Sequence, residues 1–436
     1  MYWDKLRKKS VWGIILLLIA QLFVAPAVQS AEATPAGLDL EAKAAVLMDA
    51  ATGQVLFSLD ADTPYPPASM SKMMTEYLVL EAIAEGKLKW TDEVAATRNA
   101  ATTTPEGSRV ALAEGETHTV EKLFIALAVG SANDAAIALA ERIAGTEEEF
   151  VKLMNEKAKE LGLTNSRFIN STGLSRADML PEYQPKSIDG ETMMSALDSA
   201  KLAQALLRDY PEVLRFTSIP NYKFRERDQG ELINFNWMLE ANKNITNFRS
   251  FAYDGLDGMK TGHTSQAGYT FTGTAKRGDI RLISVVMKTD SKEKRFHETR
   301  KLLDYGFSNF EPKTIVPAKV ELEELPSLPV KKGVEKSVPL VTETGVTVLA
   351  LKGETNDQVT ITAQPIDENE LVAPIEKGTV LGKATVTYKD AQNHTFEQTV
   401  NLIALEDVEK AGWFRLLMRA IQEFFADVFQ SIKELF

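Results

Sequence analysis

Two residues three positions apart, Ser69 and Lys72, are the first in the chain whose types and spacing could do covalent chemistry. They stand at the start of a predicted helix, directly after Pro66 and Pro67, and residues three apart share one helix face. The lysine amine can therefore reach the serine oxygen and act as its base. The helix start adds N–H groups and partial positive charge that suit an oxyanion forming on the serine. Because S-x-x-K is common by chance, this motif alone does not identify an active site.

Two further motifs follow, each at the edge of a predicted element. Ser131-Ala132-Asn133 comes directly after an apolar helix that ends at Gly130, and Lys260-Thr261-Gly262 comes before a strand that starts near Tyr269. The serines of the first two motifs are 62 residues apart, and Lys260 follows 129 residues after Ser131. Three such motifs in this order predict one composite site around a nucleophilic serine.

The elements that would position these motifs mix helices with paired strands. A β-hairpin is predicted over 44–59, and two strands over 269–276 and 281–288 are separated by Arg277-Gly278-Asp279. Helices are predicted from Ser69 to before Gly86, and over 120–129, 147–161, 193–208 and 293–305. We therefore expect an α+β domain.

The composition changes after about residue 314. A predicted linker is punctuated by Pro312, Pro317, Pro326 and Pro329. Short β-branched runs separated by glycine turns follow over 346–351, 359–364, 380–388 and 396–405. This pattern predicts a small β-sandwich-like domain over 314–405, without a catalytic cluster, behind a catalytic domain over 34–313.

The N-terminus has the pattern of a secretory signal peptide. Lys5, Arg7, Lys8 and Lys9 precede an apolar run over 11–24, and Ala31-Glu32-Ala33 fits a cleavage site. We expect residues 1–33 to be removed on export. An uncleaved membrane anchor is the alternative, although the run is near the short limit for a membrane span.

The C-terminal segment, residues 406–436, contains a predicted amphipathic helix. Its apolar residues recur at helical spacing: Trp413, Leu417, Ile421, Phe424, Phe425, Val428, Ile432 and Leu435. Most of its charged residues fall on the opposite side, so we expect the helix to lie in a membrane interface rather than to cross it. A helix packed on the protein or in an oligomer is the alternative. Together the two ends predict an exported protein held peripherally at the outer face of the cytoplasmic membrane.

The composition excludes several kinds of chemistry. The 436 residues contain no cysteine, which removes disulfides, thiolate nucleophiles and cysteine-ligated zinc. Lys and Arg number 49 against 61 Asp and Glu, and the resulting net charge of −12 argues against nucleic acid as a partner. His118, His297 and His394 have no metal-ligand spacing, and no nucleotide-binding motif is present. We expect neither a metal nor a cofactor.

The three motifs and their flanks resemble those of the serine penicillin-recognising enzymes. The resemblance is closest to the low-molecular-weight penicillin-binding proteins, the serine-type D-alanyl-D-alanine carboxypeptidases, and covers most of the mature chain. The stretches that carry it are Pro67–Thr75, Ser131–Ala135, Asn170–Leu174, Asp257–Thr264 with Ala267–Tyr269, Arg281–Val286 and Leu302–Phe307. The exocellular Gram-positive members are the best match.

This resemblance implies a fold and an activity. The fold is a β-lactamase-like catalytic domain, with an antiparallel sheet flanked by helices, followed by a small β-rich domain and a C-terminal amphipathic anchor. The substrate is a peptidoglycan pentapeptide stem ending in D-Ala-D-Ala, from which the enzyme removes the last D-Ala through an acyl-serine intermediate. β-Lactam antibiotics such as penicillin are expected to acylate and inhibit it.

Roles for the site residues follow from the resemblance together with elementary chemistry. Ser69 is the expected nucleophile and Lys72 its base, provided that burial and the charge of Lys260 lower the lysine pKa. Ser131 would relay a proton to the leaving amine, and Asn133 would orient Lys72 and bind the substrate amide. The remaining candidates are Lys260, Thr261 and Gly262 for the terminal carboxylate, the backbone N–H of His263 beside that of Ser69 for the oxyanion, and Arg281 as a possible support for the carboxylate.

Two other functions are open at this point. A β-lactamase has the same fold with fast deacylation, although it needs neither a β-rich domain nor an anchor. A non-catalytic wall-binding protein would keep the fold without needing Lys72, Ser131 or Lys260, and all three are present. For Arg281, an ordinary charge on the strand surface is the alternative to a role in substrate binding.

Overall fold

The computed structural model describes residues 38–436 except 105–106, 354, 356, 391–394 and 434–436. All the described residues belong to one unit, residues 34–436. The predicted signal peptide therefore lies outside the described residues.

A five-stranded antiparallel sheet organises the N-terminal domain, with strand order β2-β1-β11-β10-β9. Its strands are β1 (Ala44–Asp49), β2 (Val55–Leu59), β9 (Leu256–Thr264), β10 (Gly268–Arg277) and β11 (Ile280–Thr289). The predicted hairpin and both predicted strands are present. The Lys260-Thr261-Gly262 motif precedes the predicted strand, which is β10, and in addition lies inside the edge strand β9, which pairs with β10 over nearly its whole length.

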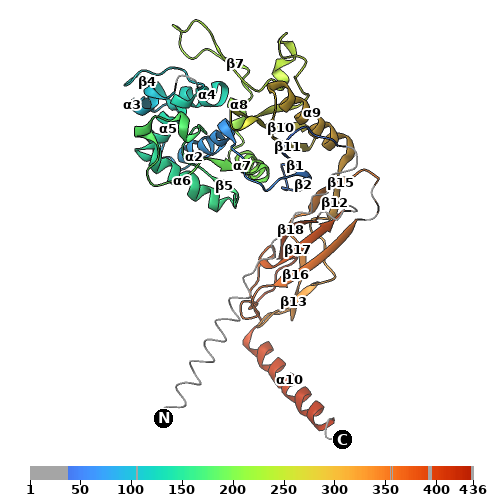
Figure 1. The fold of residues 1–436 in the computed structure, drawn as a ribbon. Coiled ribbons are helices and arrows are strands. Elements are labelled where there is room, and N and C mark those ends of the chain that lie inside the picture. The colour runs from blue at the N-terminus through green and yellow to red at the C-terminus, as the bar shows by residue number, and fades with distance from the viewer. Residues whose placement is uncertain (1–37, 105–106, 354, 356, 391–394, 434–436) are drawn as a thin grey trace, which may run out of the picture. The chain divides into compact units, whose positions relative to one another are not determined.

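Alternate residues of this sheet face two separate cores, as the two-residue period of a strand requires. On β1, Val46 belongs to the core shared with helices α2 (Lys72–Ala84) and α7 (Ala196–Asp209). Leu47 belongs to the opposite core, which is covered by α9 (Lys292–Asn309). Helices thus cover both faces of the sheet (Figure 1).

The remaining helices of this domain pack together beside the sheet. They are α3 (Arg98–Thr102), α4 (Val120–Gly130), α5 (Asn133–Ala144), α6 (Glu147–Glu160) and α8 (Val213–Thr217). Thr119, Thr146, Ser195 and Ser291 cap four of the predicted helices, because each side-chain oxygen accepts the N–H three residues on. Short two-stranded ladders complete the domain: β3 (Glu93–Ala95) with β4 (Thr117–Thr119), β5 (Ser166–Arg167) with β6 (Met193–Met194), and β7 (Asn221–Tyr222) with β8 (Leu232–Ile233).

The C-terminal domain is built from strands, as predicted. One sheet has the order β13-β14-β18-β17-β16, and β12 pairs with β15 in a separate ladder. The strands are β12 (Phe310–Val316), β13 (Ser327–Pro329), β14 (Ser337–Thr342), β15 (Val346–Leu351), β16 (Gln358–Pro365), β17 (Val380–Lys389) and β18 (Thr395–Ala404). The predicted linker is wrong at its start, because Pro312 lies inside β12, where an edge strand tolerates a residue without an N–H.

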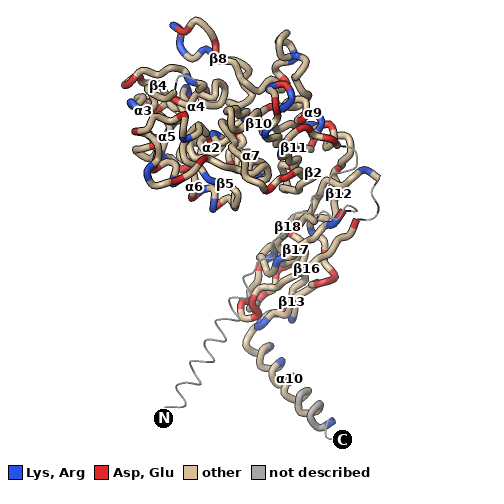
Figure 2. The backbone as a smooth tube through the Cα atoms, viewed as in Figure 1, with Lys and Arg blue, Asp and Glu red and all other residues tan. Residues whose placement is uncertain are grey.

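A single helix, α10 (Trp413–Lys433), follows the C-terminal domain. Its large apolar side chains are exposed, with Trp413 77%, Phe424 64% and Phe429 78% accessible. Among the described residues, no helix is long and apolar enough to cross a membrane. Acidic and basic residues are interspersed along the described parts of the chain (Figure 2).

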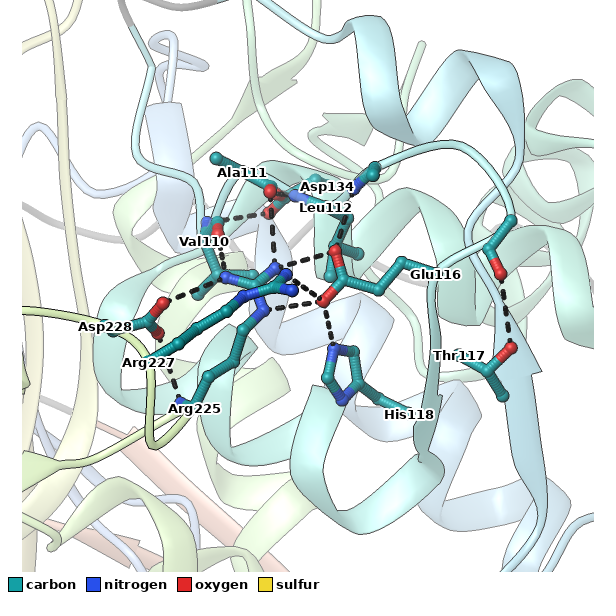
Figure 3. Close-up of polar contacts among 12 residues, drawn as sticks. Val110, Ala111, Leu112, Glu116, Thr117, His118, Asp134, Arg225, Arg227 and Asp228 are labelled. Atoms are coloured by element: carbon teal, nitrogen blue, oxygen red, sulfur yellow. Dashed lines mark hydrogen bonds and ion pairs between the residues drawn. The ribbon is translucent and has the colours of Figure 1, made fainter.

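The loop between α3 and β4 is held in place from two sides (Figure 3). Asp134, at the start of α5, accepts the N–H groups of Val110 and Leu112 at 3.1 and 3.0 Å. From the other side, Arg225 of the β7–β8 hairpin donates to the Val110 carbonyl at 2.7 Å and to the Glu116 carboxylate at 2.6 and 3.1 Å. The loop is therefore fixed by charge-assisted bonds to both the helical layer and the hairpin.

Glu116 is the centre of this cluster, since it also accepts Arg227 at 2.9 Å and contacts His118 Nε2 at 2.9 Å (Figure 3). Burial raises the pKa of Glu116, but the Ala113 N–H, Arg225 and His118 outweigh burial and lower it to about 2, from 4.5. A carboxyl with a lowered pKa stabilises the fold above its unfolded pKa and loses that contribution as the pH falls through its folded pKa.

We predict that Glu116→Gln lowers the free energy of unfolding at pH 7 by about 1–3 kcal/mol, because two arginines lose their ionised partner. The deficit should narrow as the pH falls from 4.5 towards 2, which urea unfolding followed by tryptophan fluorescence can measure. Glu114→Gln, an exposed neighbour in the same loop, should change the stability little at any pH. An equal deficit for Glu116→Gln at pH 3 and pH 7 would contradict this ion-pair account.

Candidate active site

Ser69 and Lys72 meet as the S-x-x-K spacing predicts. Ser69 lies in a short 3-10 helix, Ala68–Ser71, that leads directly into α2. Lys72 Nζ is 3.0 Å from Ser69 Oγ, and it is also 2.6 Å from Asn133 Oδ1 and 2.6 Å from the Thr172 carbonyl oxygen. Lys72 is fully buried, so its amine has three protein neighbours in place of water.

The surroundings of Lys72 favour its neutral form. Burial, and then the charge of Lys260, lower the pKa of Lys72 well below its usual 10.5. A neutral amine has two N–H groups and one lone pair. The carbonyl oxygens of Asn133 and Thr172 accept the two N–H groups, which leaves the lone pair for the Ser69 hydroxyl.

The segment that supplies the Thr172 carbonyl lies against the serine helix. Asn170 Oδ1 accepts the N–H groups of Thr172 and Gly173, and Gly173 has a positive φ of 79°. A Cβ on Gly173 would lie 2.0 Å from the Ala68 carbonyl oxygen, so only glycine allows this approach. The resemblance had marked this segment, but nothing in its residue types predicted a contact with Lys72.

Ser131 and Asn133 lie at a break between two helices. Ser131 ends α4 in the left-handed conformation, with φ 53° and ψ 31°, and Asn133 begins α5. Left-handed backbone is strained for a serine, and such strain gathers at functional sites. Ser131 is buried yet borders the cleft, and its Oγ has no hydrogen-bond partner among the described residues. Its hydroxyl is thus available to a bound molecule.

The third motif forms the edge of the sheet next to the serine. On β9, Lys260, Gly262 and His263 pair with Thr272, Thr270 and Tyr269 of β10. A Cβ on Gly262 would lie 2.4 Å from the Pro67 carbonyl oxygen, so the strand approaches the serine helix as closely as a backbone can. An edge strand has one row of unpaired backbone groups.

Lys260 and His263 differ in exposure. Lys260 is 2% exposed, its ammonium donates to the Thr261 carbonyl at 3.2 Å, and burial lowers its pKa. His263 is exposed, and its ring stacks on Tyr269 with 4.2 Å between centroids. Partial burial, and then the charges of Arg295 and Lys292, lower the pKa of His263. Its ring is therefore neutral at pH 7, at the rim of the site.

A cleft opens between these elements. Its described lining residues come from all three motifs and from the loops around them: Ser69, Gly107, Ser108, Ser131, Asn133, Gly173, Leu174, Phe235, Thr261, Gly262, His263, Thr264, Tyr269, Lys292 and Arg295. Gly107 and Ser108 belong to the α3–β4 loop that Asp134 and Arg225 hold. Among the residues that the structure describes, no group of three or more acidic or histidine side chains could hold a metal ion.

Arg281 does not reach this cleft. Arg281 pairs with Lys276 of β10, whereas Lys260 pairs with Thr272 of the same strand. Lys276 and Thr272 are four residues apart, which at 3.3 Å per residue separates the two positions along β10 by about 13 Å. The guanidinium of Arg281 is bound to both oxygens of Asp257 at 2.7 Å. The structure therefore does not bring Arg281 together with the cleft residues, because an ion pair with Asp257 holds it farther along the sheet.

Arg295, on α9, is the buried cation that the sequence reasoning missed. It is 3% exposed, lines the cleft, and donates to the Gly262 and Thr270 carbonyls at 3.1 and 3.4 Å. Burial lowers its pKa to about 10, so it stays charged at pH 7. In the sequence it follows Lys292-Glu293-Lys294, a run typical of a solvated helix start, and only tertiary packing distinguishes it.

Comparison with known proteins identifies the family and the fold. Residues 28–291 match the family described as D-alanyl-D-alanine carboxypeptidase, and residues 310–410 match the C-terminal domain of penicillin-binding protein 5. The chain is 36% identical over 381 residues to the D-alanyl-D-alanine carboxypeptidase DacF of Bacillus subtilis, covering 87% of this chain and 89% of DacF.

Solved structures agree with this match. Penicillin-binding protein 5 from Haemophilus influenzae has a TM-score of 0.68 at 33% identity, over 87% of this chain and all of that one. Penicillin-binding protein D2 from Listeria monocytogenes, solved in an ampicillin-bound form, has a TM-score of 0.52 at 34% identity, over 63% of this chain and all of that one. The resemblance drawn from the three motifs is confirmed. This chain belongs to the D-alanyl-D-alanine carboxypeptidase family of serine hydrolases and has the fold of the low-molecular-weight penicillin-binding proteins.

Proposed function

We propose that this protein removes the terminal D-alanine from peptidoglycan pentapeptide stems through an acyl-enzyme on Ser69. The position of Lys72 Nζ carries the proposal, since it lies 3.0 Å from Ser69 Oγ and is buried against two carbonyl oxygens. This arrangement activates a serine without a histidine. In this proposal Ser69, Lys72 and Ser131 are catalytic, and the other cleft residues bind substrate.

The acylation step uses each of these groups once. Ser69 Oγ attacks the carbonyl carbon of the penultimate D-alanine while its proton passes to Lys72 Nζ. The backbone N–H groups of Ser69 and His263 stabilise the oxyanion, a contribution of about 3 kcal/mol per donor in other enzymes. The C–N bond then breaks, and Ser131 relays the proton from Lys72 to the leaving amine. In the second half-reaction water attacks the ester while its proton passes to Lys72, the bond between the acyl carbon and Ser69 Oγ breaks, and Lys72 returns the proton to Ser69 Oγ.

The terminal carboxylate of the stem would bind where the cations gather. Lys260 and Thr261 are the proposed direct partners, and Gly262 lets their strand approach the serine. Arg295 and Lys292, which also line the cleft, add positive charge on the same side. Because these cations lie in a partly water-excluded cleft, they would attract a carboxylate more strongly than exposed lysines do.

We also propose that the enzyme is exported by a signal peptide over residues 1–33 and lies at the outer face of the cytoplasmic membrane. The support for membrane attachment is α10, whose aromatic side chains Trp413, Phe414, Phe424, Phe425 and Phe429 are 61–78% exposed. A helix with one apolar face and few apolar contacts binds in the plane of a membrane interface.

We predict that Ser69→Ala abolishes activity. Release of D-alanine from diacetyl-Lys-D-Ala-D-Ala should fall about a thousandfold or more, and fluorescent penicillin should no longer label the protein. Ser265→Ala, an exposed serine in the turn after β9, should keep both activities. Lasting penicillin labelling of the unmodified protein is expected, whereas rapid penicillin turnover would indicate a β-lactamase. Equal D-alanine release by Ser69→Ala and the unmodified protein would refute the mechanism.

We predict that a chain ending at Gly412, without α10, keeps its peptidase activity but moves from the membrane to the soluble fraction. In the full chain, the double change Phe424→Ser with Phe425→Ser should weaken membrane binding in the same direction. Gln422→Ser, an exposed polar position on the same helix, is the matched control and should leave binding unchanged. Sedimentation with membranes and with lipid vesicles measures both effects. If the shortened chain sediments with membranes to the same extent as the full chain, α10 is not the membrane anchor.

A further inference from the structure

A buried carboxyl group, Glu76, lies one helical turn after Lys72 on α2. The side chain is fully buried, and neither carboxyl oxygen has a hydrogen-bond partner among the described residues. An ionised carboxylate without donors is costly to bury unless opposite charge stands close to it. The proposed mechanism gives Glu76 no task, so its presence beside the site requires another explanation.

Burial raises the pKa of Glu76 from 4.5 to about 7, and the charges of Lys260 and then Lys72 act against that rise. Glu76 is therefore mainly ionised above that pH, where its charge can act on Lys260. Lys72 is four positions earlier on the same helix face, and Lys260 is on β9, against which α2 packs. The other helices that pack on α2 bring two more carboxyls near Lys72, Asp134 on α5 and Glu147 on α6. Helices α4 and α7 also pack on α2 and bring no group that acts on Glu76.

Glu76 differs from those two carboxyls in how its charge is supported. Asp134 accepts N–H groups of Val110, Leu112 and Ala135, and Glu147 accepts the Ser171 N–H and hydroxyl at 2.9 and 2.7 Å. Their negative charge is thus supported by hydrogen bonds. The charge of Glu76 is supported only by the two lysines, so its protonation must be linked to theirs.

The proposed mechanism needs the two lysines in opposite states, with Lys72 neutral and Lys260 charged. Burial lowers the pKa of both, and Arg295 lowers that of Lys260 further. Glu76 is the one carboxyl that raises the pKa of Lys260, whereas on Lys72 its effect is smaller than that of Lys260 itself. Glu76 therefore favours the charged form of Lys260 more than that of Lys72. This difference suits a charged Lys260 that binds the carboxylate and a neutral Lys72 that acts as base.

We propose that Glu76 is a positioning residue, the internal counter-ion that keeps Lys260 protonated for binding the substrate carboxylate while Lys72 acts as base. The inference rests on the proposed function of this site. It assigns Glu76 no contact with substrate, since it acts through Lys260. Loss of its charge would remove the carboxylate that raises the pKa of Lys260, so Lys260 would give up its proton at a lower pH.

The test compares Glu76→Gln and Glu76→Met, which remove the charge, with Glu76→Asp, which keeps it. Methionine fills a similar volume without an unpaired polar group, so it serves if the glutamine variant does not fold. The second-order rate constant for penicillin acylation and the KM for diacetyl-Lys-D-Ala-D-Ala are measured from pH 5 to 10. The fall in rate at high pH reports Lys260 losing its proton, and the fall at low pH reports Lys72 gaining one.

In both neutral variants, we expect the pH at which the acylation rate falls on the alkaline side to decrease by at least one unit. The pH at which the rate falls on the acidic side should decrease by a smaller amount. At pH 9, KM should rise on the order of tenfold, whereas kcat should change less. Glu76→Asp should restore most of the original profile. Against a peptide ending in a carboxamide, which has no charge for Lys260 to bind, the neutral variants should differ little from the unmodified protein.

Three outcomes would overturn the inference. One is that the acylation rate falls at the same alkaline pH in Glu76→Met and in the unmodified protein. Another is an equal loss of rate at every pH in all three variants, which indicates a packing role. The third is an equal loss on the acid and the carboxamide peptide. Failure of the unmodified protein to be acylated by penicillin would instead refute the proposed function, so the two failures are distinguishable.

Discussion

The burial of one amine, Lys72 Nζ, is the constraint on which the rest of the site depends. A lysine in water is charged at neutral pH and cannot act as a base, and here burial, helped by the charge of Lys260, lowers its pKa. The serine helix, the start of α5 and the 170–174 segment each contribute one atom to that enclosure. Gly173 and Gly262 serve the same enclosure, because without a side chain they let their backbones lie directly against the carbonyls of Ala68 and Pro67 beside the serine.

Buried charged residues around this enclosure hold the backbone segments that form it. Asp134 and Glu147 are acidic, yet their main work is to accept backbone and hydroxyl donors that hold loops against α5 and α6. Arg295 holds β9 through the Gly262 carbonyl. Asp134, Glu147 and Arg295 thus each fix a backbone segment next to the site.

Most of the fold and the centre of the site could be predicted from the sequence, because their signals are local. The spacing of Ser69 and Lys72 predicts a contact within one helical turn. The order of the three motifs indicates the family. By contrast, Arg295 lies in a run of charges that looks solvated, and the Thr172 carbonyl is a backbone atom that residue types do not mark. The placement of Arg281 could not be predicted either, since its partner Asp257 lies 24 positions away and only strand register brings them together. The motif on β9 went unrecognised as a strand because its lysine and glycine residues have weak strand preference.

The order of strands in the sheet has a consequence for how the chain becomes active. Val46 on β1 pairs with Val285 on β11, so the sheet closes a loop of more than 200 residues. Chains dominated by such distant pairings fold slowly, and β1 has no strand but β2 to pair with until β11 has been synthesised. Lys260 and the rest of the third motif lie on β9, so the site is complete only when this late part of the catalytic domain has been synthesised.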